Sequence, residues 1–193
     1  MAHYDNRTAA DWTYLTAAPP PGVASSAVKA CYQFDGTADK LTDRSAGSNT
    51  LVASGTTFDV VMPGSDLVGL SLVSALLKCT TPDAALYITG ALTLEFMGCL
   101  QNDTVQYLIS MGNNAGTEAD NVLYEWSAQG GEYYKNQFRC ENGSGTMSTN
   151  NGLTAAPAGM PTYMAITRDA SGNLNQYIEG VLTNTGESVT TPT

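Results

Sequence analysis

Few side chains in this sequence are suited to nucleophilic, redox or metal chemistry. The only histidine is His3, at the start of the chain, so Ser–His and Cys–His active sites and histidine-based metal sites are not expected. The four cysteines are far apart and form no Cys-x-x-Cys pair of the kind found in zinc and redox sites. They are Cys31, Cys79, Cys99 and Cys140. Because no secretory signal is recognisable, we expect reduced thiols on strands.

Carboxylates are the remaining candidates for acid–base catalysis. Hydrolysis of a glycosidic bond requires two of them flanking one bond. The spacing of Glu125 and Glu132 comes nearest to such a pair, but Gly130-Gly131 predicts a turn that places Glu132 on another strand. Glu95 is a single carboxylate in an alternating segment. We therefore expect solvated strand carboxylates, no catalytic residues, and a protein that is not an enzyme.

A cluster of aromatic and amide side chains suggests sugar binding instead. Sugar sites on β-sandwiches combine aromatic faces for stacking with polar groups for hydrogen bonds. The cluster consists of Tyr124, Trp126, Tyr133, Tyr134 and Asn136. Packing in a core or at its rim is the alternative for each of these aromatic residues.

The charge balance excludes two classes of partner. Eight Lys and Arg against 18 Asp and Glu give the chain a net charge of −10, which repels phosphate backbones and anionic membranes. The longest apolar-rich stretch, 67–77, is about half as long as a bilayer requires. We expect neither nucleic-acid binding nor membrane insertion.

The elements that must position these residues are predicted to be strands. Short alternating segments, bounded by Gly, Asn, Asp and Pro, recur from residue 30 onward, most clearly at 88–100. Further strands are expected at 30–34, 105–110, 121–126, 137–140, 163–167 and 174–178. Residues 67–78 also fit helical spacing, and we predict two short strands broken near Ser74-Ala75. Without a long amphipathic helix, the pattern predicts an antiparallel β-sandwich over residues 28–193.

Residues 1–27 differ from the rest of the chain. Three consecutive prolines, Pro19 to Pro21, favour polyproline II and predict an extended Pro-rich arm. A disordered leader is one interpretation. The other is an anchor that docks on another protein through Tyr4, Trp12 and Tyr14.

Three motifs in order resemble the laminin-G-like, concanavalin A-like jelly-roll domain. They are Tyr32–Gly36 followed by Asp43–Gly47, then Gly90–Phe96, then Tyr163–Gly172 followed by Gln176–Leu182. The resemblance covers about residues 30 to 185 and implies an all-β antiparallel sandwich. Met97 and Pro161 depart from the family, which has tryptophan at both places. The family's final strands have no counterpart, so we expect a truncated representative, one portion of a longer chain, or a sheet whose missing strand a neighbouring subunit supplies. We favour completion from outside these residues and a homo-oligomer.

The same resemblance implies a calcium site. Calcium-binding members have an Asp ahead of the strand that here begins near residue 121, and by position that Asp is Asp120. Glu118 and Asn113, with loop carbonyls, offer further oxygen ligands. An ordinary polar loop is the alternative.

These features together favour a bacteriophage virion protein made in the host cytoplasm. We expect a non-enzymatic fibre, appendage or head-decoration protein, joined to other virion proteins by its arm, that presents a lectin-like sandwich to a host-surface glycan. A purely structural decoration or cement protein without a ligand is the alternative. A glycan hydrolase and an exported cellular lectin domain come third.

Overall fold

The chain forms two compact units, Met1–Leu86 and Tyr87–Thr193. The computed structural model describes residues 28–32, 34, 41–43, 45, 47, 49–55, 57–61, 68–72, 76–79, 86, 88, 90–101, 105–112, 122–131, 136–141, 147–150 and 153–188. These residues contain twelve strands and no α-helix, and all strand pairs are antiparallel. Accordingly, no described helix could cross a membrane. The predicted arm, residues 1–27 with Tyr4, Trp12 and Tyr14, lies outside the described residues.

The first unit contains two small two-stranded sheets. Strand β1 (Leu51–Ser54) pairs with β4 (Leu76–Cys79), and β2 (Thr57–Val61) pairs with β3 (Val68–Ser71). In β4, exposed Leu76 and Lys78 alternate with half-buried Leu77 and Cys79, the period of a strand and not of a helix. The prediction of two short strands within residues 67–78 is confirmed, since β3 ends at Ser71 and β4 begins at Leu76.

The strand expected at 30–34 is absent from its described residues, and a carboxylate organises this region instead. Asp43 accepts hydrogen bonds from the backbone N–H groups of Cys31 (2.9 Å), Ser45 (2.8 Å) and Asn49 (2.9 Å). The Asn49 side-chain amide also donates to Asp43, at 3.0 Å. The backbone N–H of Cys31 is thus held by a side chain, and no strand partner is needed to satisfy it.

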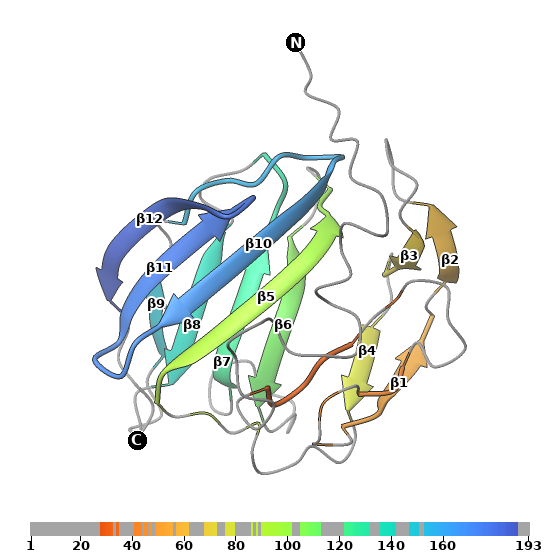
Figure 1. Ribbon diagram of the computed structural model, residues 1–193, viewed down its shortest axis with the longest axis horizontal. Helices are drawn as coiled ribbons and strands as arrows, with labels where there is room; N and C mark the ends of the chain where they lie inside the picture. Colours follow the sequence, from red (N-terminus) through yellow and green to blue (C-terminus); the bar gives the residue numbers. More distant parts are fainter. Residues whose placement is uncertain are drawn as a thin grey trace. The chain divides into compact units, whose positions relative to one another are not determined.

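The second unit is built from two four-stranded sheets (Figure 1). The first sheet has the order β12-β11-β10-β5 and the second has the order β6-β7-β8-β9. The bounds in the first sheet are β5 (Leu92–Cys99), β10 (Pro161–Arg168), β11 (Asn173–Ile178) and β12 (Val181–Ser188). In the second they are β6 (Gln106–Gly112), β7 (Val122–Ala128), β8 (Gln137–Glu141) and β9 (Met147–Asn150).

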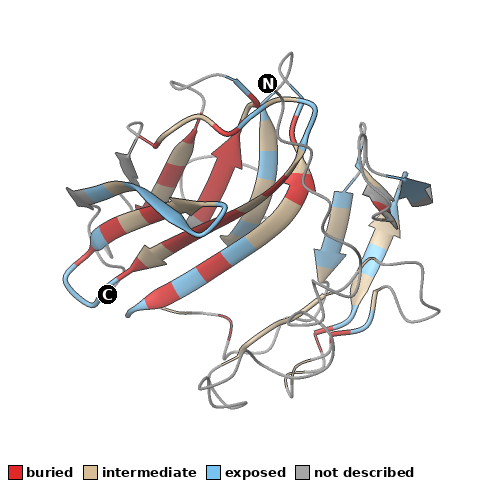
Figure 2. Cartoon of the chain, turned by 45° about the horizontal axis from the view of Figure 1, so that its top comes forward, coloured by how far each residue is buried: buried red, intermediate tan, exposed pale blue. Residues whose placement is uncertain are grey.

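An apolar core lies between the two sheets, so this unit is a β-sandwich. Along most of β5, β8 and β11, buried positions alternate with more exposed ones, which directs one face of each sheet inward (Figure 2), whereas residues 125–128 of β7 are all buried. The first sheet contributes Leu92, Leu94, Met164, Ile166 and Leu174 to the core. The second sheet contributes Trp126, Ala128, Phe138 and Cys140, and the connecting segments add Leu100, Leu153 and Ala156.

The eight strands of the sandwich span residues 92–188 within the second unit. Within the motif at 176–182, Glu179 and Gly180 form a turn and have left-handed φ values of 52° and 76°. This turn connects β11 to β12, a strand that was not predicted from the sequence.

Candidate functional site

The candidate site is the outer face of the β6–β9 sheet. Along β7, Trp126 and Ala128 point into the core, so Glu125 and Ser127 are on the opposite face. Along β8, Phe138 and Cys140 are core residues, which places Gln137 and Arg139 on the outer face as well. Strand alternation therefore brings four polar side chains from two neighbouring strands onto one face of the sheet, where Glu125 and Ser127 are buried and Gln137 and Arg139 are half-buried.

Cross-strand register aligns these residues in two rows. In the first row, Glu125 lies opposite Ser110 of β6 on one side and Arg139 of β8 on the other. Thr149 of β9 continues this row by register. In the second row, Ser127 lies between Tyr107 of β6 and Gln137 of β8. Directly opposed residues are close enough for their side chains to interact.

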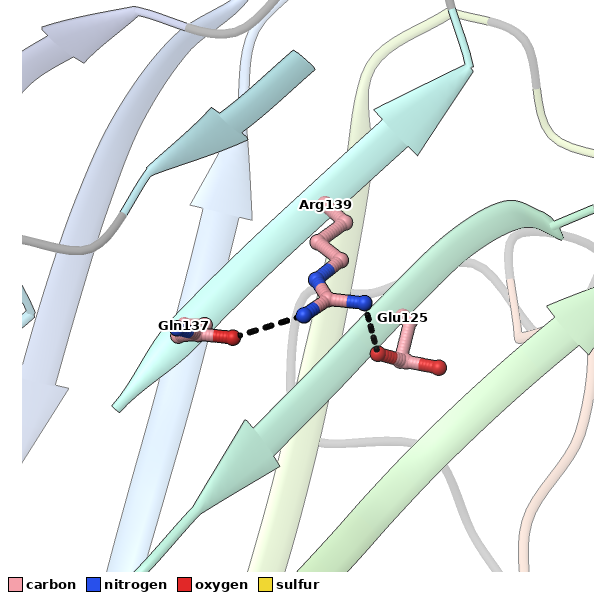
Figure 3. A network of polar contacts seen from close by, with 3 residues as sticks. All are labelled: Glu125, Gln137 and Arg139. Carbon is pink, nitrogen blue, oxygen red and sulfur yellow. Dashed lines mark hydrogen bonds and ion pairs between the residues drawn. The ribbon is translucent and has the colours of Figure 1, made fainter. Parts of the chain in front are cut away.

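Arg139 links the two rows (Figure 3). Its Nη1 is 3.6 Å from Glu125 Oε1, and its Nη2 donates a hydrogen bond of 3.0 Å to Gln137 Oε1. The side chain of Arg139 is 37% exposed and that of Glu125 is 10% exposed. A carboxylate this far from water requires a nearby cation, and Arg139 supplies it.

The chemistry of this face is that of polar recognition. A carboxylate, a planar guanidinium and a carboxamide accept and donate hydrogen bonds in fixed directions, as needed to bind hydroxyl groups. Tyr107, 64% exposed at the end of the second row, adds an aromatic ring. We refer to Tyr107, Glu125, Gln137 and Arg139 as the polar face.

Trp126 was expected to stack on a sugar, and the structure corrects this expectation. Its side chain is fully buried among the core residues, so neither face of the indole is open to a ligand. Asn136, also expected at the sugar site, is 1% exposed. Tyr124 lies in β7 opposite core-facing Cys140, but its side chain is outside the described part of the structure, as are Tyr133 and Tyr134 altogether.

The predicted calcium loop cannot be placed: Asn113, Glu118 and Asp120 all lie outside the described residues. Within the described ranges, no group of three or more His, Cys, Asp or Glu side chains is arranged to hold a metal ion. As expected, Gly130 and Gly131 form a turn after β7, and Glu132 follows it outside the described residues. Glu95 lies on the other sheet, in β5.

Sequence reasoning missed Tyr107 and Arg139 as members of the candidate site. The signal was present in part, because Glu125-x-Ser127 and Gln137-x-Arg139 are polar pairs at strand spacing on either side of the Gly130-Gly131 turn. Pairing β7 with β8 around that turn places Glu125 opposite Arg139. The position of Tyr107 opposite Ser127 depends on the bulge between Tyr107 and Ile109 in β6, which the sequence pattern does not predict.

Comparisons with known proteins give no relative from which a function could be inferred: no family model matches the chain, and neither does any curated protein or solved structure. The fold and the candidate site therefore define only a structural class: an all-β antiparallel protein with a polar face on one sheet of a sandwich.

Proposed function

We propose that this chain is a non-enzymatic recognition protein of a bacteriophage virion that binds a host-surface glycan through the polar face. The observation that carries the proposal is the link from Arg139 to Glu125 and Gln137 beside exposed Tyr107. Carbohydrate hydroxyls are bound by such planar polar groups, while a tyrosine ring covers the apolar face of a sugar.

Binding without cleavage is the role that the two rows favour. Glycosidic hydrolysis needs an acid and a second carboxyl group flanking one bond. Within the two rows, Glu125 is the one carboxylate, and its neighbours in register are Ser110 and Arg139. These neighbours can hold a hydroxyl group, but neither is the second carboxyl group of a glycosidase.

The virion assignment rests on the sequence. A chain with net charge −10, only 13% charged residues and a Pro-rich segment before a β-sandwich is typical of phage surface proteins that resemble laminin-G-like domains. The proposal includes attachment to other virion proteins through residues 1–27 and assembly as a homo-oligomer. It also retains calcium as a ligand of the loop with Asn113, Glu118 and Asp120.

A purely structural decoration protein is the second candidate. The observation that favours it is the burial of Glu125, together with Arg139, which directs both terminal nitrogens to partners within the sheet. In this second candidate, the pair holds β7 and β8 together and contacts no ligand.

The test is binding of the purified chain to a panel of bacterial surface glycans, with and without a calcium chelator, while released oligosaccharide is monitored. Saturable binding without release supports the proposal, and loss of binding on chelation supports the calcium loop. Release of oligosaccharide would instead indicate a hydrolase. No binding by a chain that circular dichroism shows to be folded would favour the structural candidate.

A further inference from the structure

The other sheet of the sandwich also has a patterned outer face. On β10, Met164 and Ile166 are core residues, so Tyr163, Ala165 and Thr167 point outward. In register, Ala165 lies between Glu95 of β5 and Tyr177 of β11. The small Ala165 side chain is therefore flanked by a carboxylate and a ring across the sheet, and by Tyr163 along its own strand.

Tyr163 and Glu95 interact directly. By register their side chains are diagonal neighbours on the outer face of the sheet. Burial, together with the charge and hydrogen bond of Glu95, raises the pKa of Tyr163 to about 12. Glu95 is exposed and both tyrosines are half-buried, so the carboxylate and parts of both rings are open to solvent. Tyr163 and Tyr177 are diagonal neighbours on adjacent strands, within reach of one another.

The charge on this face has one sign. The four strands β5, β10, β11 and β12 contain a single basic residue, Arg168, and it is 1% exposed with its guanidinium in the core. Glu95 is on the outer face, and Glu179 follows β11 in the adjacent turn, where its Oε1 accepts the Tyr163 backbone N–H at 2.7 Å. Two tyrosine rings and a carboxylate without a cation are complementary to a positive group.

We propose that the outer face of β5, β10 and β11 docks a basic segment of a partner protein, with a lysine or arginine side chain at Glu95, Tyr163 and Tyr177. The carboxylate provides the charge partner, and the ring faces provide cation–π attraction and cover the aliphatic part of the side chain. This surface is on the opposite sheet from the polar face and does not depend on glycan binding.

The experiment is a titration of the isotope-labelled full chain with tetralysine and tetra-arginine at low salt, followed by amide chemical shifts. Tetraglutamate is the control peptide. We expect saturable shifts concentrated in β5, β10 and β11 with both basic peptides and weaker binding as salt rises. Shifts spread evenly over the acidic surface would contradict the proposal, and so would the absence of shifts.

Variants separate this site from general attraction to an acidic chain. Glu95→Gln and Tyr177→Leu should each raise the Kd for the basic peptides about two- to fivefold, the range of exposed ion pairs and cation–π contacts. Glu141→Gln makes the same charge change on β8, in the other sheet, and should leave the Kd unchanged. An equal effect of Glu141→Gln would overturn the proposal. Shifts at Tyr163 and Tyr177 caused by a neutral glycan and not by the peptides would also overturn it.

Discussion

At the residue scale, one carboxylate organises each of two loops. Asp43 accepts hydrogen bonds from residues 31, 45 and 49, and Asp169 accepts them from the backbone N–H groups of Ser171 (2.8 Å) and Asn173 (2.9 Å). The Asn173 side chain donates to Asp169 as Asn49 does to Asp43. The two carboxylates differ in environment, since Asp43 is 6% exposed and Asp169 is exposed.

Replacing Asp43 should destabilise the first unit. Asp43→Asn substitutes an N–H donor for one of the accepting oxygens, and we expect a loss of about 2–3 kcal/mol in the free energy of unfolding, measured with denaturant. Asp169→Asn is the matched control and should cost less, because water can replace the lost partners. Equal effects of the two substitutions would contradict this interpretation.

The Asp43 network also predicts a pH dependence. Burial raises the pKa of the Asp43 carboxyl, but the hydrogen bonds from Asn49, Cys31 and Ser45 outweigh it and hold the pKa below the ordinary 3.8. The folded state therefore favours the ionised form, and its stabilisation is complete above the unfolded pKa and is lost as the pH falls through the folded pKa. Unfolding monitored between pH 6 and 2 should show a larger loss of stability in the wild type than in Asp43→Asn.

Arg168 places a guanidinium inside the sandwich. It donates to the Cys140 sulfur (2.7 Å) and to the carbonyl oxygens of Ile88 (3.2 Å) and Gly90 (2.5 Å). Burial raises the pKa of the Cys140 thiol, although Arg168 acts against this shift. The guanidinium thus ties β10 to β8 and to the segment before β5.

Truncating Arg168 to alanine should lower the free energy of unfolding more than replacing it with methionine, which is similar in length. Arg168→Ala leaves a cavity and unpaired carbonyl groups, and we expect a loss of about 3–5 kcal/mol in the free energy of unfolding. Arg168→Met fills most of the volume and should cost less. Thermal or denaturant unfolding of both variants measures the two losses. A larger loss in Arg168→Met than in Arg168→Ala would contradict the buried, hydrogen-bonded role of Arg168.

At the element scale, strands with clear alternation could be predicted and those without it could not. The segments at 88–100, 105–110 and 163–167 correspond to β5, β6 and β10. In β5 and β10 apolar residues face the core with a period of two, whereas a bulge interrupts this period in β6. The short strands β1, β2 and β9 were not predicted, since four or five residues carry little periodic signal. At 30–34 the alternation was misleading, because Asp43 holds the Cys31 backbone N–H.

Three connecting segments, at residues 100–101, 130–131 and 156–159, are joined by backbone hydrogen bonds beside the sandwich core. The N–H of Gly130 donates to Gln101 (2.7 Å), that of Gly131 to Ala156 (2.8 Å) and that of Gly159 to Leu100 (2.9 Å). A Cβ atom on Gly130 would lie 2.9 Å from the Ala158 Cα and 3.0 Å from the Leu100 carbonyl oxygen. The end of β7 thus tolerates no side chain where it meets these segments.

This close approach predicts a contrast between two glycines. Gly130→Ala must displace backbone atoms and should lower the free energy of unfolding by about 1–3 kcal/mol. Gly90→Ala places its Cβ in open space and should change it by less than about 0.5 kcal/mol. Denaturant unfolding of the two variants measures the contrast, and comparable losses would contradict the close approach.

At the scale of the whole molecule, the sequence predicted an all-β sandwich but not its division into two units. Alternation indicates strands without telling which strands share a core. The same limit applies to the site, because Glu125 was recognised as a strand carboxylate while its ion pair with Arg139 depends on the β7–β8 register. Strand alternation explains why Trp126 is buried, because it places the indole on the inner face of β7.

The two units should differ in stability. Among the described residues, the buried apolar cluster lies entirely in the second unit, whereas the buried side chains of the first include Asp43 and Asn49. Apolar burial is the main stabilising contribution to folding, so we expect β1–β4 to exchange amide hydrogens faster than β5, β7, β8 and β10. Hydrogen exchange by mass spectrometry measures this, and equal protection of both sets would contradict it.

The most direct test of the central claim compares glycan affinity in variants of the polar face. For the best-bound glycan of the panel, Tyr107→Ala should weaken binding about five- to tenfold, as expected for loss of an aromatic stacking partner. Arg139→Lys keeps a cation beside Glu125 but removes the planar donors, and it should weaken binding as well. Met160→Ala, an exposed apolar residue just before β10, is the control and should have no effect. Unchanged affinity in both polar-face variants, or no glycan bound by the folded chain, would contradict the account.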